Sequence, residues 1–364
     1  MTWNVGILGA TGAVGQKMIR GLVDHPWFRI TEVAASERSA GKTYAEAARW
    51  LQESPIPGQV EVLEVKFAEP GLRCDFVLSA LDSSVAGPIE EQFARAGYPV
   101  ISNSRNHRME DDVPLVIPEI NPDHLNLIAW QKEHRGFTTG YIVTNPNCST
   151  VGLAMALKPL DDAFGVSEVF VATMQAVSGA GYPGVASLDA IENVIPFISG
   201  EEEKMQTEPR KILGKLAGHS VKFAEFKVSP HCNRVPVLEG HLESVSVRFK
   251  SKATAADVRR ALVSWIGEPQ RLGLPTAPKH PILVSDEADR PQPRKDRDAG
   301  RGMTVSVGRI RPCEILDFRF TLLVHNTIRG AAGAAILNAE LLADRGMLPH
   351  RDRLEESVVS KKQA

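Results

Sequence analysis

Apolar and amphipathic segments alternate along the first part of the chain, up to about residue 145. The short apolar runs that predict buried strands lie at residues 4–9, 30–35, 60–65, 75–81, 100–102 and 142–143. The segments between them place apolar residues at helical spacing, as at Met18, Ile19 and Leu22. Strands that alternate with helices favour a parallel sheet covered by helices on both faces, so we predict an α/β domain here.

Longer strands with few helices between them are typical of the second half. The runs that predict these strands lie at residues 166–177, 241–249, 303–310 and 315–324. This order favours a mostly antiparallel sheet and hence an α+β domain. Helices are expected after residue 150, through residues 200–213 and at residues 331–342, where small residues favour packing against the first sheet. Residues 286–302 are polar and predict a long excursion without a core of its own.

A glycine-rich loop joins the first predicted strand to the first predicted helix. It reads Gly9-Ala10-Thr11-Gly12-Ala13-Val14-Gly15, a G-x-x-G-x-x-G variant of the dinucleotide-binding fingerprint. Glycines permit a tight turn and a close approach of the backbone to a pyrophosphate, and the helix N-terminus offers N–H donors. We therefore predict cofactor binding here, with a plain strand-to-helix turn as the alternative. The predicted contacts are Gly9, Thr11, Gly12, Ala13 and Val14.

The segment after the second predicted strand indicates which dinucleotide is preferred. An NAD site usually places a carboxylate there for the ribose hydroxyls. In this chain Ser36, Arg38, Ser39 and Lys42 suit a 2′-phosphate instead, with Arg38 best placed. Glu37 is a conflicting signal, and a solvated loop is the alternative. We predict NADP rather than NAD.

Two further polar loops follow strands at the same predicted edge of the sheet, where ligands of such folds lie. Ser83 follows the strand at residues 75–81 and is either a cofactor contact or a cap of the next helix. The loop at residues 103–112 carries Arg105 and Arg108. Arginines in loops are usually solvated charges, but at an edge that faces a cofactor they are candidates for anion binding.

A cysteine lies where the first pattern gives way to the second. The segment Thr144-Asn145-Pro146-Asn147-Cys148-Ser149-Thr150 separates the last predicted strand of the first part from an apolar helix. Pro146 cannot lie inside a helix and Asn147 favours a helix start, so Cys148 is placed at a helix N-terminus. Backbone N–H groups and the helix dipole favour a thiolate there and can hold an oxyanion. We predict a nucleophilic cysteine, with a buried cysteine after a turn as the alternative.

Residues 228–241 form a second segment that is rich in polar chemistry. Arg234 and His241 lie around a loop rather than on a helix, because Pro236 and Gly240 would break one. Such a loop can direct both side chains into one cleft, where a histidine facing Cys148 would serve as general base and later as acid. A structural histidine is the alternative, since the chain has 10 histidines.

Composition narrows the class of protein. The chain has 364 residues, which predicts two domains or one large one, and its 43% hydrophobic and 24% charged residues are typical of a soluble globular protein. A net charge of −2 gives no reason to expect nucleic acid or a membrane as a partner. No apolar run approaches the roughly 20 residues of a membrane span, and no signal peptide is expected. The widely spaced Cys74, Cys148, Cys232 and Cys313 argue against a metal site and against disulfides, and suit the cytoplasm.

Several motifs occur together in one order. They are the glycine loop at residues 9–15, then residues 145–150, 175–181, 201–204, 234–241 and 325–327. Together they resemble aspartate-semialdehyde dehydrogenases of the archaeal and fungal-type branch, over about residues 4–346. The resemblance implies a Rossmann-type NADP-binding domain with a parallel sheet and a second, catalytic and dimerisation α+β domain with a mostly antiparallel sheet. The predicted bounds are residues 1–147 plus 327–350, residues 148–326, and a C-terminal tail at residues 351–364.

The resemblance also implies a role for each matched residue. Cys148 is the nucleophile, His241 the acid/base group, and Gln175 orients a thioester intermediate. Arg234 grips the substrate carboxylate, and Glu201 contacts the substrate amino group, with the adjacent Glu202 left open as the alternative. The remaining assignments are Arg108 and Lys204 for phosphate, Asn103 as an assisting group, and Ser178, Gly179 and Asn326 for the cofactor.

The implied reaction is the NADPH-dependent reductive dephosphorylation of L-aspartyl-4-phosphate to L-aspartate 4-semialdehyde, a step in the biosynthesis of lysine, threonine, methionine and isoleucine. The family implies a homodimer or homotetramer that acts on small molecules. A malonyl-CoA or succinyl-CoA reductase on the same fold is one alternative, although Arg108 and Lys204 favour phosphate. N-acetyl-glutamyl-phosphate reductase is a related enzyme, but residues 234–241 match the semialdehyde branch. A non-catalytic dinucleotide-binding protein would have lost Cys148 or His241, and both are present.

Overall fold

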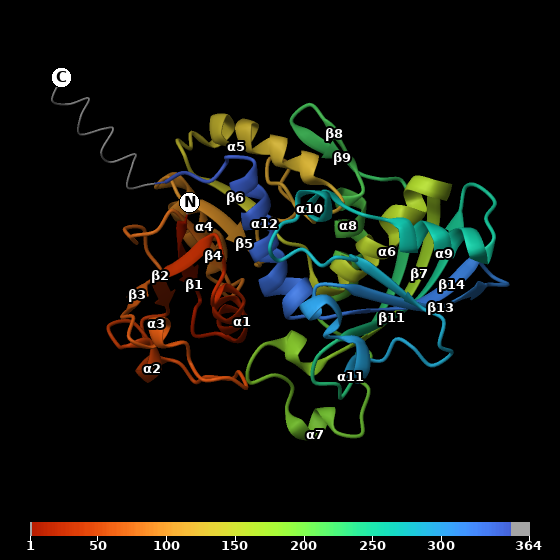
Figure 1. The fold of residues 1–364 in the computed structure, drawn as a ribbon, viewed down its shortest axis with the longest axis horizontal. Helices are drawn as coiled ribbons and strands as arrows, with labels where there is room; N and C mark the ends of the chain where they lie inside the picture. The colour runs from red at the N-terminus through yellow and green to blue at the C-terminus, as the bar shows by residue number, and fades with distance from the viewer. Residues whose placement is uncertain (1, 351–364) are drawn as a thin grey trace. The chain divides into compact units, whose positions relative to one another are not determined.

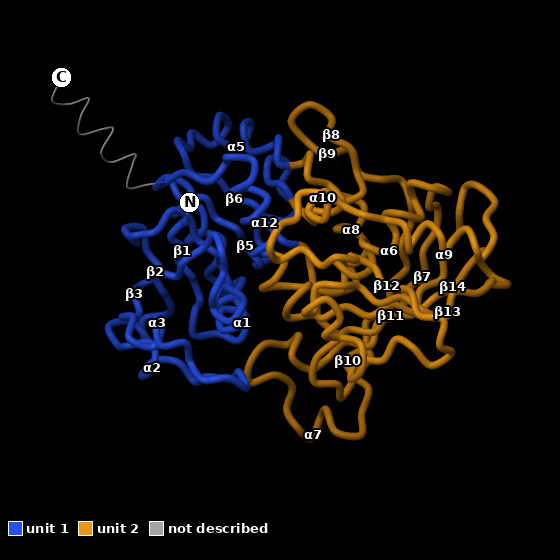
Figure 2. The backbone as a smooth tube through the Cα atoms, viewed as in Figure 1, with its two compact units in different colours: residues 1–114, 125–145, 335–364 blue, residues 115–124, 146–334 orange. Residues whose placement is uncertain are grey.

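The computed structural model describes residues 2–350. Contacts within the chain divide it into two compact units, shown in different colours in Figure 2. Unit 1 holds the described residues of Met1–Pro114, Leu125–Asn145 and Ala335–Ala364, and unit 2 holds Leu115–His124 and Pro146–Ala334. The predicted tail at residues 351–364 lies outside the described residues. The boundaries that the sequence analysis gives for the cofactor-binding and catalytic domains remain a prediction.

Unit 1 is built on a six-stranded parallel sheet of order β3-β2-β1-β4-β5-β6 (Figure 1). Its strands are β1 Trp3–Leu8, β2 Phe28–Ala35, β3 Val65–Phe67, β4 Phe76–Ser79, β5 Pro99–Ser102 and β6 Tyr141–Thr144. Apolar residues on both faces of the central strands are buried, as in a sheet covered on both sides. The order reverses between β1 and β4, as in the Rossmann fold, and ligands of such sheets lie outside the carboxyl ends near this point.

Helices connect these strands and pack against them. They are α1 Ala13–Leu22, α2 Tyr44–Ala47, α3 Gly58–Glu61, α4 Ala86–Arg95, α5 Leu127–Arg135 and α12 Gly333–Asp344. Right-handed crossovers on the two sides of β1 place the connecting helices on opposite faces of the sheet. Helix α12 comes from the end of the chain, and its Glu340 lies 2.8 Å from Nε2 of His25. From Ala335 onward this helix belongs to unit 1.

The strand predicted at residues 60–65 is wrong. Residues Gly58–Glu61 form the short helix α3, and only Val65–Phe67 pairs with β2. The segment at 60–65 is rich in valine, which is typical of a strand. However, Pro57 precedes a helical turn that buries Val60 completely, so this residue is buried by a helix and not by a sheet.

Unit 2 is built on a six-stranded mixed sheet of order β10-β7-β11-β14-β13-β12. Its strands are β7 Val166–Gln175, β10 Lys227–Arg234, β11 His241–Phe249, β12 Ile282–Ser285, β13 Val305–Pro312 and β14 Phe318–Val324. Strand β7 pairs with β11, β11 with β14, and β14 with β13 in antiparallel fashion, whereas the outer pairs are parallel. The prediction of a mostly antiparallel sheet is therefore confirmed. A small hairpin adds β8 Lys215–Ala217 and β9 Ser220–Lys222.

Helices cover one face of this sheet. They are α6 Cys148–Phe164, α8 Glu201–Ile212 and α9 Ala255–Ser264. The unit also contains three short helices, α7 Ser187–Ala190, α10 Glu268–Leu272 and α11 Pro293–Asp296. Single turns add η1 Pro122–Asn126, η2 Val177–Ala180, η3 Ala299–Gly302 and the π-helical segment η4 Ile328–Ala332. Leu153 and Leu157 on α6 pack into one core with Val245 and Leu322 of the sheet. Within residues 2–350, no helix combines the length and apolar character that a membrane crossing requires.

Candidate active site

Cys148 is the first residue of helix α6, as the sequence predicts. Asn147 caps this helix, because its Oδ1 accepts hydrogen bonds from the backbone N–H groups of Ser149, at 3.0 Å, and Thr150, at 3.3 Å. The cap is itself held in place, since the N–H of Asn147 donates to Oε2 of Glu208 at 2.7 Å. The thiol therefore lies at the positive end of a rigid 17-residue helix, which favours the thiolate.

His241 faces this thiol. Its Nε2 lies 3.2 Å from Sγ of Cys148, and its Nδ1 accepts a hydrogen bond from the backbone N–H of Ala176 at 3.1 Å. Because the lone pair of Nδ1 is engaged in this way, the neutral ring carries its proton on Nε2. Burial lowers the pKa of His241 most strongly, and electrostatic interactions with Arg234 and His325 lower it further, to about 3. At neutral pH the ring is therefore uncharged and directs its N–H at the sulfur.

The sheet of unit 2 brings three predicted residues into one row. Arg234 ends β10 opposite Gln175, which ends β7, and His241 begins β11 next to the pair of Leu242 and Met174. Cross-strand neighbours of this kind lie about 5 Å apart. Nη1 of Arg234 donates to the carbonyl oxygen of Ala176 at 2.8 Å, so the guanidinium is tied to the same turn that holds the histidine. Register therefore assembles this row from distant parts of the sequence.

The first turn of α8 contributes a carboxylate and a cation. Glu201 lies 2.6 Å from Nζ of Lys204, and its carboxylate accepts hydrogen bonds from Asn147 at 3.0 Å and from Gln175 at 3.3 Å. Glu202 instead accepts from the backbone N–H of Cys232 at 3.1 Å. Of the two adjacent acids, Glu201 is the one that contacts the other predicted site residues.

The loop after β7 lies over the same row. A methyl group added at Gly179 would lie 2.8 Å from Nη1 of Arg234 and 3.1 Å from Cε1 of His241, so only a glycine lets the backbone approach both side chains. Asn326 joins this loop to the segment before β11, because its Nδ2 donates to Oγ of Ser178 and its Oδ1 accepts from the N–H of Gly240, both at 2.8 Å. The structure thus places Ser178, Gly179 and Asn326 together in unit 2.

Gly330 is a site residue that the sequence analysis missed. It lies in the π-helical segment η4, and a methyl group added there would be 2.6 Å from Cβ of Cys148. The adjacent Arg329 is fully buried and binds Glu119 through hydrogen bonds of 2.8 and 2.6 Å. Short π-helical segments occur frequently at functional sites. The residues around Gly330 in the sequence give no indication that it lies against Cys148.

The glycine loop of unit 1 has the geometry expected of a pyrophosphate cradle. Gly9 has a φ of 74°, and a methyl group there would lie 2.5 Å from the carbonyl oxygen of Ala80, so the turn requires glycine. A methyl group at Gly15 would clash with the carbonyl oxygen of Gly9. Gly12 caps helix α1 without a side-chain hydrogen bond, and the first turn of α1 has no acidic residue. These residues therefore fit a dinucleotide pyrophosphate.

The other predicted cofactor residues of unit 1 lie in loops at the carboxyl ends of strands. Ser36, Arg38 and Lys42 are exposed and Ser39 is half-buried in the loop after β2, where Nζ of Lys42 donates to the carbonyl oxygen of Arg38 at 3.1 Å. Ser83 lies in the loop after β4 and does not cap α4, whose N-cap residue is Val85. This loop is joined to the one after β5 because Nδ2 of Asn106 donates to the carbonyl oxygen of Ser83 at 3.0 Å.

Asn103 and Arg108 lie together in the loop after β5. Nη2 of Arg108 donates to the carbonyl oxygen of Asn103 at 2.7 Å, and Arg108 is 7% exposed. The Asn103 side chain is fixed from two directions, because its Nδ2 donates to the carbonyl oxygen of Ser79 at 3.2 Å and its Oδ1 accepts from Asn145 at 2.8 Å. The guanidinium is therefore held at the carboxyl edge of the sheet rather than solvated.

The predicted residues fall into two sets. Unit 2 holds Cys148, His241, Gln175, Arg234, Glu201, Lys204, Ser178, Gly179 and Asn326, and unit 1 holds Gly9, Thr11, Gly12, Ala13, Val14, Ser36, Arg38, Ser39, Lys42, Ser83, Asn103 and Arg108. Over the part of the chain that the structure describes, no group of three or more His, Cys, Asp or Glu residues is arranged to hold a metal ion.

Comparison with known proteins identifies the family. Residues 4–128 match the family described as "Semialdehyde dehydrogenase, NAD binding domain", and residues 157–329 match "Semialdehyde dehydrogenase, dimerisation domain". The aspartate-semialdehyde dehydrogenase of Archaeoglobus fulgidus is 51% identical over 343 residues, which cover 94% of this chain and 98% of that protein. The aspartate-semialdehyde dehydrogenase of Schizosaccharomyces pombe is 49% identical over 352 residues, covering 94% of this chain and 99% of that protein.

A solved structure agrees with the fold. The crystal structure of aspartate-semialdehyde dehydrogenase with NADP from Candida albicans superposes with a TM-score of 0.88 at 43% identity, covering 96% of this chain and all of that chain (100%). The archaeal and fungal relatives are those that the motifs of the sequence predict. The chain belongs to the aspartate-semialdehyde dehydrogenase family.

Proposed function

We propose that this protein reduces L-aspartyl-4-phosphate to L-aspartate 4-semialdehyde with NADPH, through a thioester on Cys148. The observation that carries the proposal is the contact of 3.2 Å between the Cys148 sulfur, at the start of α6, and the N–H-bearing Nε2 of His241. A thiol held in this setting is a nucleophile rather than a packing residue. The names of the related enzymes supply the substrate.

The chain's own residues account for formation of the thioester. The Cys148 thiolate attacks the acyl carbon, the bond from that carbon to the phosphate oxygen breaks, and phosphate leaves with the bonding electrons. The positive end of the α6 dipole favours the negative charge that develops on the acyl oxygen, while the N–H groups of Ser149 and Thr150 stay bound to the Asn147 cap. Since the neutral His241 ring already carries its proton on Nε2, it stabilises the thiolate before attack rather than removing a proton from the thiol.

The same ring serves the later release of the aldehyde. NADPH, when bound, supplies the hydride that reduces the thioester carbon. The carbon–sulfur bond of the reduced adduct then breaks, the carbonyl forms, and the electron pair returns to the Cys148 sulfur, which the Nε2 proton of His241 again stabilises. His241 is therefore proposed to act in both steps as a hydrogen-bond donor to the sulfur, and not as the base that the sequence first suggested.

Charged residues around this pair suit an amino acid substrate. Arg234 is proposed to bind the substrate carboxylate, because a guanidinium matches a carboxylate in a bidentate way. Glu201 is proposed to bind the substrate ammonium group, since it and not Glu202 contacts Asn147 and Gln175. Lys204 and Arg108, with Asn103, are proposed to bind the phosphate group, and Gln175 to orient the acyl group.

The cofactor is proposed to be NADP. The loop at residues 9–15 would hold the pyrophosphate, because its glycines make a turn that no side chain could occupy. The exposed Ser36, Arg38 and Lys42, with Ser39, would hold the 2′-phosphate. Replacing Arg38 by Ala should raise the KM for NADP about tenfold, as expected for one lost charge-assisted hydrogen bond, and leave the KM for NAD unchanged. An equal rise for both cofactors would argue against a 2′-phosphate contact.

The reverse reaction distinguishes the proposed function from its alternatives. With L-aspartate 4-semialdehyde, inorganic phosphate and NADP, the purified protein should form NADPH, and Cys148→Ala should abolish this activity. Turnover that requires coenzyme A and ignores phosphate would instead establish an acyl-CoA reductase. Absence of turnover with either acceptor, in a protein that binds NADP, would favour a non-catalytic role. The related enzymes favour neither alternative.

Assembly into a homodimer is proposed from the surface of unit 2. Alternate residues of β7 and β11 are buried, so one face of the sheet is open, and Phe170 on it is 43% exposed. The segment around α7 also exposes Leu188 and Phe197, at 90% and 69%. Apolar surface of this kind marks protein contacts. Light scattering should give the mass of a dimer or a tetramer, and a monomer would contradict the proposal.

The free cysteines are consistent with a cytoplasmic protein.

A further inference from the structure

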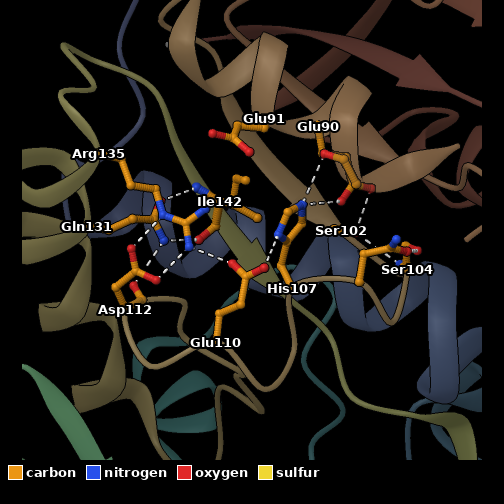
Figure 3. A network of polar contacts seen from close by, with 12 residues as sticks. Glu90, Glu91, Ser102, Ser104, His107, Glu110, Asp112, Gln131, Arg135 and Ile142 are labelled. Atoms are coloured by element: carbon orange, nitrogen blue, oxygen red, sulfur yellow. Dashed lines mark hydrogen bonds and ion pairs between the residues drawn. The ribbon is translucent and has the colours of Figure 1, made fainter.

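The loop that carries Asn103 and Arg108 is held by a network of charged groups, some of them buried (Figure 3). Residues 103–112 contain no helix or strand and form only turns and bends. His107 lies in the middle of this loop and is 5% exposed. Figure 3 shows its ring between Glu90 and Glu110, with Arg135 on the far side of Glu110.

Both ring nitrogens of His107 face groups that can only accept a hydrogen bond. Nε2 lies 3.2 Å from the carbonyl oxygen of Gly87, and Nδ1 lies 3.0 Å from Oε1 of Glu110. A carbonyl oxygen never donates, and the Glu110 carboxylate is ionised because it also binds Arg135 at 2.5 Å. Both nitrogens therefore carry protons, and the ring is an imidazolium.

The charge of this ring is balanced by the carboxylates around it. Glu90 on α4 has its Oε2 3.8 Å from Nε2 of His107, and Glu110 is the closer partner. Arg135 on α5 is shared between Glu110 and Asp112, and Arg108 lies near Glu90. Burial alone would lower the pKa of His107, but the hydrogen bond and charge of Glu110, the charge of Glu90 and the carbonyl of Gly87 together raise it.

The network connects the loop to the frame of unit 1. Oε1 of Glu90, which is completely buried, accepts hydrogen bonds from Ser79 at 2.6 Å and from Ser102 at 2.7 Å. These serines end the adjacent strands β4 and β5. His107 thus ties the middle of the loop to α4 through Gly87, and to α5 through Glu110 and Arg135.

Arg108 follows His107 directly, and its guanidinium closes back on Asn103 at the start of the same loop. We propose that His107 is a positioning residue whose doubly protonated ring clamps the loop at residues 103–112 and thereby sets the place of Arg108. The inference rests on the proposed function insofar as Arg108 is taken to bind phosphate. Loss of the Nδ1 proton would leave a lone pair facing the Glu110 carboxylate, so the clamp would open on that side.

The sign of the pH dependence follows from the raised pKa. The clamp is complete below the ordinary histidine value of about 6.5 and is lost as the pH rises through the higher pKa in the folded protein. Phosphate binding should therefore weaken at alkaline pH. Phosphate itself titrates in this range, so the quantity to compare is the ratio of KM values between two enzymes at each pH.

The first measurement observes the ring of His107 directly and does not depend on activity. In protein labelled with ¹⁵N-histidine, the ring nitrogens of His107, assigned by their loss in His107→Gln, should both show the shifts of protonated nitrogen at neutral pH. The exposed His134 on α5 provides the matched control residue. A neutral His107 ring at neutral pH would overturn the proposal.

The second measurement is the phosphate KM at saturating semialdehyde and NADP. At neutral pH, His107→Gln should raise it about tenfold over the matched control His134→Gln, the effect of losing a hydrogen bond to a charged group, with kcat little changed. The ratio of the two KM values should shrink as the pH rises, because His107 in the control enzyme then loses its second ring proton and the clamp opens there too. A ratio of one at every pH would overturn the proposal.

Arg108→Ala separates this inference from the proposed function. If Arg108→Ala leaves the phosphate KM unchanged, the phosphate role of Arg108 is refuted, and the inference falls with it. If Arg108→Ala raises the KM, His107→Gln should add little in that background, because both changes act through one guanidinium. Effects that multiply in full would overturn the inference alone.

Discussion

Gly330→Ala should impair catalysis far more than it impairs folding. The added methyl group would lie 2.6 Å from Cβ and 2.9 Å from Cα of Cys148. Non-bonded carbon atoms approach favourably only to about 3.5 Å, so the two segments must separate by about 1 Å. The backbone of Gly330 does not adopt the left-handed conformation, and the glycine is therefore required for space and not for its φ angle.

The structure indicates which side of this contact moves. Segment η4 is anchored by Arg329, which is fully buried and makes hydrogen bonds of 2.8 and 2.6 Å to Glu119. Part of the shift must then fall on Cys148 and on its contact with His241. Overpacking of this kind costs about 1–3 kcal/mol of stability. A displacement of about 1 Å at a reacting atom costs about 100-fold in rate, so we expect kcat to fall by about that factor.

The assay compares Gly330→Ala with Gly333→Ala. A methyl group at Gly333 would meet Met303 and Ile328 rather than Cys148, so this control should lose similar stability and keep its kcat. Initial rates of NADPH formation, thermal unfolding, and the rate of alkylation at Cys148 followed by peptide mass analysis would be measured on both proteins. Wild-type kcat and wild-type alkylation in Gly330→Ala would refute the reasoning.

Three other changes test separate parts of the account. His241→Gln should lower kcat by about 10²–10⁴-fold with little change in the KM for semialdehyde. The pH profile of wild-type kcat should show no inflection from His241 near pH 6.5, since the pKa of this histidine is about 3. An inflection there that disappears in the variant would contradict this. Arg329→Met should lower the free energy of unfolding of unit 2, measured in urea, by about 3–5 kcal/mol, because Glu119 is left buried without its partner. Adding Glu119→Leu should recover most of this loss. Equal unfolding free energies in the single and double variants would argue against a buried ion pair. For Glu110, burial opposes ionisation, but His107 and Arg135 lower its pKa from 4.5 to about 2, so its stabilising effect is complete above pH 4.5 and is lost as the pH falls towards 2. Arg135→Met should therefore flatten the acid unfolding curve in this range, whereas Arg95→Met should not.

The sequence predicts those features of the fold that adjacent residues determine. Pro146 and Asn147 place the start of α6 at Cys148, because the proline excludes a helix before it and the asparagine caps the helix after it. The turn at Gly9 is likewise a property of a few consecutive residues. The segment at residues 60–65 shows the limit, since its valine-rich composition suits a strand but pairing with β2 begins only at Val65.

Contacts between distant residues could not be predicted in the same way. The row of Arg234, Gln175 and His241 depends on the register of three strands. The loop pattern connected Arg234 with His241, but only the family resemblance connected Gln175 with them. Glu90 occupies a helix and would be expected at the surface, yet it is completely buried under two serines of neighbouring strands. The tautomer of His241 depends on one backbone N–H, that of Ala176, which carries no side-chain signal.

Trapping the acyl-enzyme would show whether Cys148 is the nucleophile. The protein would be mixed with L-aspartate 4-semialdehyde and NADP without phosphate, quenched in acid, digested and analysed by mass spectrometry, with Cys313→Ser as a check on the other half-exposed thiol. We expect an aspartyl thioester on the peptide that contains Cys148, which disappears when phosphate is added before the quench. An unmodified Cys148 in protein that turns over normally, or an adduct on another residue, would contradict the account.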